Sequence, residues 1–241
     1  VYTQESFCNA VCGTTFIKID GSYSKDDYKD FSIPKKGGIR NLSYLPKSSA
    51  LYTLQTKLLH CFLAKISLPT CVIGFRPNES YKSYLSPHVG NTYFLRIDIK
   101  DFFPSITDKL IASELACVLS LNKPEETDKI ITLITDIVTR NGVLPQGAST
   151  SPAISNIVMA RIDQRILKYC QVFDVTYTRY ADDLLFSSPK FDFSQKKWFF
   201  KKIKYILKSN NFRINHAKIK YAQKYLIHAS DSFFLYIFIL F

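Results

Sequence analysis

The sequence predicts an α+β fold, and three observations carry this prediction. Apolar residues make up 46% of the 241 residues and charged residues 22%, which is typical of a globular chain with a core. Short strand-like segments pair as hairpins, whereas a doubly wound sheet needs parallel strands joined by helices. Amphipathic helical segments separate these hairpins. The length allows one large domain or two small ones.

Apolar periodicity and capping residues place the elements along the chain. We expect helices over residues 48–66, 107–121, 125–140, 149–169 and 194–210. We expect strands at 31–42, as a hairpin around Gly37 and Gly38, at 93–99, at 175–188, as a second hairpin, and at 212–221, as a strand pair or a strand and turn.

The charge of the chain indicates a polyanionic partner. Lys and Arg total 32 against 20 Asp and Glu, a formal net charge of +12, and the pI is about 9.3. Nucleic acid is the first candidate and an acidic membrane surface the second; a basic but otherwise ordinary protein is the alternative. The apolar run at 233–241 is shorter than the roughly 20 residues of a membrane span, so we expect a cytoplasmic protein without a membrane partner. The six cysteines are expected to be buried free thiols.

Acidic residues inside apolar strands are the strongest chemical signal. Asp98 lies between two isoleucines, and Asp182 and Asp183 lie between the apolar arms of the second hairpin. Ionised carboxylates beside apolar surface are unfavourable unless they are paired or bind metal. If the two strands are neighbours, these carboxylates meet and suit a hard cation such as Mg²⁺. A pair of such ions catalyses phosphoryl transfer. The alternative is a solvated hairpin tip.

A third segment, GVLPQGASTSP at 142–152, is expected to form a tight loop because it contains Pro145 and Gly147. Small residues follow this loop, at the start of a predicted helix. Small side chains let a backbone approach closely, and a helix N-terminus favours anions. Gln146 is then a candidate contact for a nucleotide sugar or base. An ordinary loop and helix cap is the alternative.

Together these segments resemble the reverse transcriptase family, especially its bacterial retron and group II intron branch. RIDIKDFFPSI at 96–106 is similar to the first palm motif, GVLPQGASTSPAISNIV at 142–158 to the second, and YADD at 180–183 to the third. FSIPKKGGIRNL is similar to the fingers hairpin, GFRPNESY to the segment after it, and FRINHAKIKY to the later Asn-x-x-Lys element. The resemblance covers about residues 30 to 220.

The resemblance implies the fingers and palm of a right-hand polymerase. Residues 1–92 would form an N-terminal segment and fingers, and residues 93–228 a palm with inserted fingers helices at about 107–141. The implied activity is an RNA-directed DNA polymerase that adds deoxynucleotides to a primer 3′-hydroxyl with two Mg²⁺ ions, or Mn²⁺. Its partners would be an RNA template, a DNA or RNA primer, deoxynucleoside triphosphates and a cognate noncoding RNA. By analogy, it would serve antiphage defence.

The resemblance also assigns residue roles by position. Asp98, Asp182 and Asp183 would be the catalytic metal ligands, with the carbonyl of Ile99 as a further ligand. The nucleotide would be contacted by Lys35, Lys36, Arg40, Phe103, Gln146 and Lys218. Among these, Phe103 would exclude a 2′-hydroxyl, Arg40 with Lys35 or Lys36 would hold the triphosphate, and Lys218 would act near the leaving phosphates. The alternatives are a core phenylalanine, a solvated lysine, and hairpin cations that bind the template backbone.

Two departures from the family pattern leave alternatives open. Ile219 follows Lys218 where relatives carry Thr, and the apolar segment 229–241 stands where a helical thumb would follow. We expect an aberrant tail and a missing thumb; a thumb supplied from elsewhere is the other interpretation. The rival functions are a non-retron defence reverse transcriptase, an inactive nucleic-acid-binding remnant, and a viral-type RNA polymerase, against which Phe103 argues. The lysines of 196–208 either follow a duplex backbone or solvate a helix face.

Overall fold

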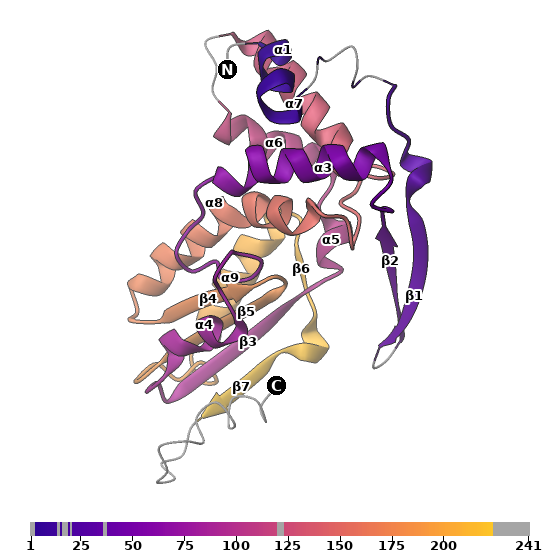
Figure 1. The fold of residues 1–241 in the computed structure, drawn as a ribbon. Coiled ribbons are helices and arrows are strands. Elements are labelled where there is room, and N and C mark those ends of the chain that lie inside the picture. Colours follow the sequence, from indigo (N-terminus) through magenta and orange to yellow (C-terminus); the bar gives the residue numbers. More distant parts are fainter. Residues whose placement is uncertain are drawn as a thin grey trace. The chain divides into compact units, whose positions relative to one another are not determined.

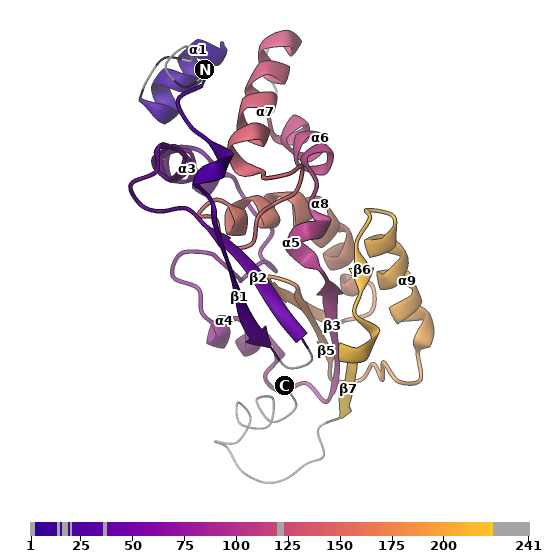
Figure 2. The same ribbon diagram turned by 90° about the vertical axis from the view of Figure 1, so that its right-hand side faces the viewer.

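The computed structural model describes residues 3–13, 15, 19, 21–35, 38–119 and 123–223 (Figures 1 and 2). These residues divide into two compact units. The first unit takes the chain up to Ser67 together with Phe103–Val158, and the second takes Leu68–Phe102 and the chain from Met159 onward. Each unit has its own core of buried apolar side chains.

The first unit carries the predicted N-terminal hairpin. Strands β1 (Lys29–Lys35) and β2 (Gly38–Tyr44) pair antiparallel, with Ile33 opposite Arg40. The hairpin is a few residues longer at its open end than 31–42, because the pairing continues to Lys29 and Tyr44. Both strands are largely exposed, so the cross-strand hydrogen bonds rather than burial hold this ribbon together.

Most of the rest of the first unit is helical: α1 (Gln4–Phe7), η1 (Cys8–Cys12), η2 (Lys25–Asp27), α3 (Ala50–Cys61), η3 (Leu63–Lys65), α6 (Asp108–Val118), α7 (Pro124–Val138) and Ser151–Val158, the first part of the helix α8 (Ser151–Gln171). The short helix α5 (Phe102–Ser105) begins at the junction of the units. Ser49 caps α3 and Thr107 caps α6, each by accepting a bond from a backbone amide three residues on. The helix predicted over 48–66 instead ends at Cys61, and a 3₁₀ turn follows it.

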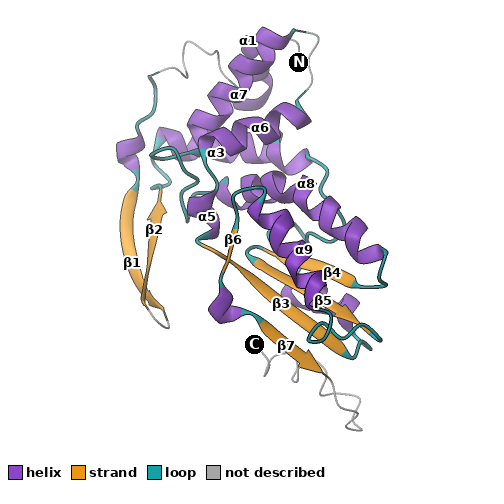
Figure 3. Ribbon diagram, turned by 180° about the vertical axis from the view of Figure 1, so that it is seen from behind, coloured by secondary structure: helices purple, strands orange, loops and turns teal. Residues whose placement is uncertain are grey.

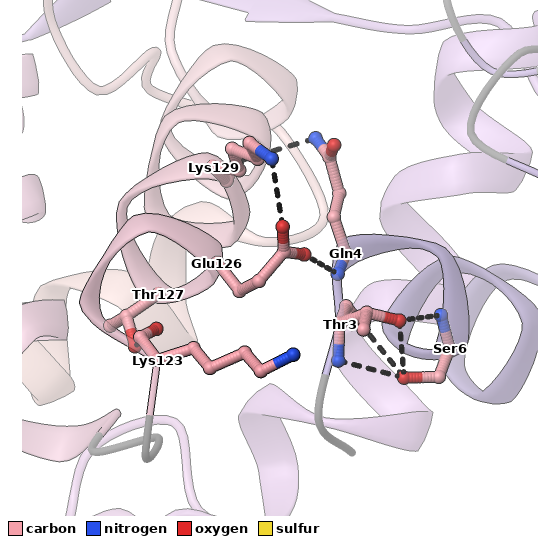
Figure 4. A network of polar contacts seen from close by, with 7 residues as sticks. All are labelled: Thr3, Gln4, Ser6, Lys123, Glu126, Thr127 and Lys129. Carbon is pink, nitrogen blue, oxygen red and sulfur yellow. Dashed lines mark hydrogen bonds and ion pairs between the residues drawn. The ribbon is translucent and has the colours of Figure 1, made fainter.

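Two sets of polar contacts, one around Gln55 and one around Glu126, fix the helices of this unit. The buried Gln55 amide of α3 donates to the Ile137 carbonyl at 2.9 Å and to the Tyr28 hydroxyl at 3.0 Å. Figure 4 shows the second set, in which Glu126 of α7 accepts a 2.7 Å bond from the backbone amide of Gln4 and pairs with Lys129. Both satisfy backbone groups at helix ends, which would otherwise lack partners.

The second unit is built on an antiparallel sheet with the order β4-β5-β3-β6, in which β7 also pairs with β3 (Figure 3). The strands are β3 (Tyr93–Lys100), β4 (Thr176–Tyr180), β5 (Asp183–Ser188), β6 (Arg213–Ile214) and β7 (Lys220–Gln223). Strand β3 is therefore central, paired with β5 on one side and with β6 and β7 on the other. The predicted strand and second hairpin are confirmed, and only Ala181 and Asp182 separate β4 from β5. The segment predicted as a strand pair or a strand and turn forms two short strands, β6 and β7, which both pair with β3 and not with each other.

Helices cover both faces of this sheet. On one face, Phe186 of β5 stacks on Tyr177 and meets Phe199 of α9 (Lys197–Lys208), while α8 (Ser151–Gln171) contributes Asp163. On the other face, Leu185 and Phe94 pack against α4 (Tyr81–Leu85), and η4 (Ser86–His88) follows. Alternate residues of a strand point to opposite faces, so Asp98 and Asp183 belong to the α4 face.

Not every predicted feature is confirmed. The thiols of Cys8, Cys12, Cys71 and Cys170 are buried and free, but Cys61 and Cys117 are exposed. Cys117 occupies the outward side of α6, whose buried side is formed by Ile111, Glu114 and Leu115. Among the described residues, no helix is both long and apolar enough to cross a lipid bilayer. Lys36 and the predicted aberrant tail, 229–241, lie outside the described residues.

We predict an acid-sensitive second unit because of His88. Its ring is fully buried, with its nitrogens 2.6 Å from Ser187 Oγ and 2.7 Å from Thr178 Oγ1. Burial lowers the pKa of His88 from 6.5 to about 3, so the folded state keeps it neutral while the unfolded chain takes up a proton. The free energy of unfolding should therefore fall as the pH drops from 6.5 toward 3, by at most about 1.4 kcal/mol per pH unit.

Urea unfolding of wild type and His88→Gln at pH 7 and pH 5 measures this effect. The variant lacks the titrating ring, so it should lose less stability between the two pH values than the wild type does. An equal loss in both proteins would contradict the assignment to His88.

Candidate active site

Three carboxylates meet at one end of the second unit's sheet. Asp98 of β3 lies directly opposite Asp183 of β5, so both side chains leave the same face, and Asp98 is only 3% exposed. Asp182 occupies the adjoining turn, where its carbonyl accepts a 2.9 Å bond from the Ile99 amide of β3. The neighbouring-strand arrangement that the sequence predicted is confirmed. Like charges directly opposite each other on adjacent strands repel, so this arrangement requires compensation.

Two cations supply that compensation. Lys218 Nζ, on η5 (His216–Lys218), lies 2.7 Å from Asp98 Oδ2. Arg96 Nε and Nη2 bind the two oxygens of Asp183 at 2.9 and 2.6 Å, the planar two-bond geometry that makes an arginine–carboxylate pair strong. The sequence singled out Lys218 for another role, near the leaving phosphates, and did not single out Arg96. The available signal was spacing: Arg96 precedes Asp98 by two residues in one strand, which puts both on one face.

Among the three carboxylates, Asp182 is the one whose negative charge is disfavoured by its surroundings. Burial raises the pKa of Asp182 above its usual value, the charges of Asp183 and Asp98 raise it further, and Lys218 lowers it. The Asp182 carboxyl is therefore held in a place that disfavours its charged form. A site with excess negative charge and hard oxygen donors suits a divalent cation.

The described residues do not form a ready-made metal cluster. No group of three or more His, Cys, Asp or Glu side chains within them has the arrangement to hold a metal ion. Asp98 and Asp183 instead face Lys218 and Arg96. The Lys218 side chain is 57% exposed, so it can leave Asp98 at little cost, whereas Arg96 is held at both oxygens of Asp183. The donor chemistry fits a hard cation at Asp98 and Asp182, once Lys218 moves.

A buried ion pair shapes the turn that presents Asp182. Arg179 of β4 and Asp163 of α8 are both fully buried, and three bonds of 2.8 to 3.0 Å join them. The Tyr177 hydroxyl donates to the same carboxylate at 2.7 Å. Arg179 Nη1 also donates to the Ala181 carbonyl at 3.0 Å. Ala181 has φ +57°, a left-handed conformation that costs an alanine about 1 kcal/mol, so this bond helps to hold a strained turn.

The segment after Pro69 packs beside the same turn and is hydrogen-bonded to the strand that leads into it. The Cys71 carbonyl accepts a bond from the Arg179 amide at 2.8 Å, and the Ile73 amide donates to the Arg179 carbonyl at 2.9 Å. A Cβ on Gly74 would lie 2.7 Å from the Ala181 nitrogen, so only glycine fits there. The segment GFRPNESY, which the sequence singled out, thus begins by packing on the backbone of the acidic turn.

The other predicted site residues belong to the first unit. Arg40 lies exposed on β2, and Lys35 ends β1. The Gln146 carbonyl accepts a 2.8 Å bond from the Ser43 amide of β2, and a Cβ on Gly147 would lie 2.7 Å from the Ser43 carbonyl oxygen. The small residues of this loop therefore let its backbone approach the N-terminal hairpin closely. Phe103 is half-buried in α5, next to the fully packed Phe102.

Comparisons with known proteins find relatives both in sequence and in fold. A family profile described as reverse transcriptase (RNA-dependent DNA polymerase) matches residues 33–230. The retron Mx65 reverse transcriptase of Myxococcus xanthus is 35% identical over 66% of this chain and 40% of its own length. The retron Ec86 reverse transcriptase of Escherichia coli is 34% identical over 67% of this chain and 49% of its own. The chain spans about half the length of these curated relatives.

Solved structures share the fold. An apo telomerase structure from Candida tropicalis matches 84% of this chain and 44% of its own with a TM-score of 0.56 at 14% identity. A telomerase from Candida albicans, solved with a fragment of telomeric RNA, matches with a TM-score of 0.52. The low identity limits this likeness to the fold, and it supports the fingers-and-palm α+β class predicted from the sequence.

We predict that Asp182→Asn makes the protein more stable. The substitution removes a charge that burial and two neighbouring carboxylates disfavour, so the free energy of unfolding near pH 7 should rise by about 1 kcal/mol. Thermal unfolding without Mg²⁺ measures this gain in stability, and thermal unfolding with Mg²⁺ measures how much the bound ion stabilises each protein. Mg²⁺ should raise the melting temperature of the wild type more than that of the variant; a variant less stable than wild type would contradict the electrostatic account.

We also predict that Arg179→Met alone is severely destabilising, by about 3–5 kcal/mol, because it leaves the Asp163 charge buried without a partner. The double variant Arg179→Met with Asp163→Leu should recover most of that loss, since it leaves no unpaired charge. Urea unfolding of the two single variants and the double variant measures the coupling. If the two single losses simply add in the double variant, the buried pair is not a coupled unit.

Proposed function

The chain belongs to the reverse transcriptase family, and on this basis we propose that it is an RNA-directed DNA polymerase that adds deoxynucleotides to the 3′-hydroxyl of a primer. The single observation that carries the proposal is the group formed by Asp98 and Asp183 on adjoining strands and Asp182 in the turn beside them. A polar site of this kind on a palm-like sheet is suited to phosphoryl transfer, in which the protein contributes mainly position and charge.

Two Mg²⁺ ions, or Mn²⁺, are the proposed cofactors. Asp98 and Asp182 would hold them, with Asp183 and the carbonyl of Ile99 as further ligands. Bound there, the ions would make the primer hydroxyl a better nucleophile and neutralise charge on the leaving pyrophosphate. Arg96 keeps the charge of Asp183 balanced, which leaves Asp182 and Asp98 as the main donors.

We assign Lys218 one role before a metal ion binds and another after it has bound. Its ammonium neutralises Asp98 while no ion is bound, and its exposed side chain is free to turn away when one binds. Nζ then becomes a proton donor for the leaving pyrophosphate. Ile219, in place of the threonine of relatives, does not alter this contact, because the contact comes from the Lys218 side chain itself.

We assign the nucleotide contacts to residues of the first unit. Arg40, with Lys35 or Lys36, would bind the triphosphate from the N-terminal hairpin. Gln146 would contact the incoming nucleotide; its backbone bond to Ser43 supports this by fixing the loop against the same hairpin. Phe103 would pack under the sugar and exclude a 2′-hydroxyl, which favours deoxynucleotides.

The partners follow from the relatives. We propose an RNA template, a DNA or RNA primer and, by likeness to the retron reverse transcriptases, a cognate noncoding RNA and a role in antiphage defence in the cytoplasm. Residues 1–92 would act as fingers and residues 93–228 as palm, with fingers helices at about 107–141.

Primer extension tests the proposed activity. Purified protein is incubated with poly(rA)/oligo(dT), dTTP and Mg²⁺ or Mn²⁺, and product length is measured. Wild type should extend the primer, and Asp182→Asn should reduce the rate by at least 10³-fold because a principal metal ligand is lost. The matched control is Asp174→Asn, the same change at an exposed turn residue of the same unit.

The control should extend at the wild-type rate. If Asp182→Asn and Asp174→Asn extend the primer at the same rate, the assignment of Asp182 to the active site is wrong. No extension by wild type under any condition, with folded protein, would remove the polymerase proposal.

A further inference from the structure

A segment whose charged residues are all basic lies next to the site described above in the sequence. Residues 193–223 contain eight lysines, one arginine and no acidic residue. An exposed helix that merely needs solubility normally mixes both signs along its surface. Within this stretch, α9 buries Phe199, Ile203 and Ile206 against the sheet and turns its lysines outward.

Part of this surface is concave. A cavity of about 480 Å³ lies between α9 and the edge strand β7, and it is lined by Ser194, Lys197, Phe200, Lys201, Lys204 and Tyr221. Tyr221 is 43% exposed, and Phe200 is half-buried. The three lysines recur at i, i+4 and i+7, one side of the helix. In the described part of the chain, no acidic side chain pairs with any of them.

The short helix η5 links the lining of this cavity to the active site through a series of contacts. Lys204 Nζ lies 3.3 Å from His216 Nε2, and the Phe200 ring is 6.3 Å from the His216 ring. His216 begins the same short helix that ends at Lys218, the partner of Asp98. All of these residues belong to the second unit, so this series of contacts lies within one compact body.

We propose that this cavity, the α9–β7 pocket, binds a single-stranded segment of nucleic acid. One unpaired base would stack on Phe200 and Tyr221, and the flanking phosphates would lie on Lys197, Lys201 and Lys204. This deepens the proposed function and rests on it, because it names a second surface of the polymerase for its nucleic-acid partner. A duplex keeps its bases stacked inside, so it could use the lysines but not the aromatic rings.

Binding of fluorescent oligonucleotides to the full chain tests the proposal. Anisotropy is measured for an unstructured RNA, a DNA of the same sequence and the corresponding duplex, in EDTA and without nucleotides. The two single strands distinguish RNA from DNA as the occupant. The double variant Phe200→Leu, Tyr221→Leu should weaken single-strand binding by about 10-fold or more and leave duplex binding unchanged. Tyr205→Leu, an exposed aromatic of α9 outside the pocket, is the matched control.

A second pair of variants distinguishes binding in the pocket from nonspecific attraction to the positive charge of the helix. Gln replaces Lys197, Lys201 and Lys204 in one protein, and Lys196, Lys202 and Lys208 in the other, so both lose the same charge. The first should lower the salt dependence of single-strand binding by about two counterions, and the second by less than one. Equal losses in both, or wild-type binding by the aromatic double variant, would overturn the pocket.

Failure here is distinguishable from failure of the proposed function. Binding is measured without metal or nucleotide, while primer extension on a short duplex measures catalysis in the same preparation. An active enzyme whose pocket variants bind single strands like wild type would refute the pocket alone.

Discussion

The repulsion between carboxylates on adjoining strands is the constraint on which the rest of the second unit depends. Asp98 and Asp183 face each other across β3 and β5, and Asp182 adds a third charge at the turn. No sheet gains stability from this arrangement, so the surrounding structure must hold it. Lys218 and Arg96 each neutralise one carboxylate, and the third keeps a raised pKa. Such a site is built for a charged ligand rather than for stability.

The position of Asp182 depends in turn on contacts far from it in the sequence. The Arg179–Asp163 pair beneath the turn and the 71–74 segment beside it fix a left-handed residue, Ala181, immediately before the acidic side chain. Both supports act on the backbone, which leaves the carboxylate oxygens of Asp182 for a ligand. A buried ion pair gives little net stability, but it penalises any conformation in which one partner is displaced. Rigid placement of the turn is the property that phosphoryl transfer requires.

The sequence predicted those features that local patterns encode. Acidic residues within apolar strands identified Asp98, Asp182 and Asp183, and hairpin chemistry placed β1 with β2 and β4 with β5. Element ends were less accurate, as at Cys61, because tertiary contacts decide where a helix stops. Arg96 and the pairing of Arg179 with Asp163 were missed, since no local pattern shows which distant side chains meet. The α9–β7 pocket needs the sheet order, which places β7 beside β3 and so beside α9.

The most direct measurement of the central claim is the position of bound Mn²⁺ in crystals of the full chain, located by anomalous scattering. We expect an anomalous peak within coordination distance of carboxylate oxygens of Asp98 and Asp182, with the Lys218 ammonium displaced from Asp98. A crystal soaked at saturating Mn²⁺ that shows no peak there, with Lys218 still on Asp98, would contradict it.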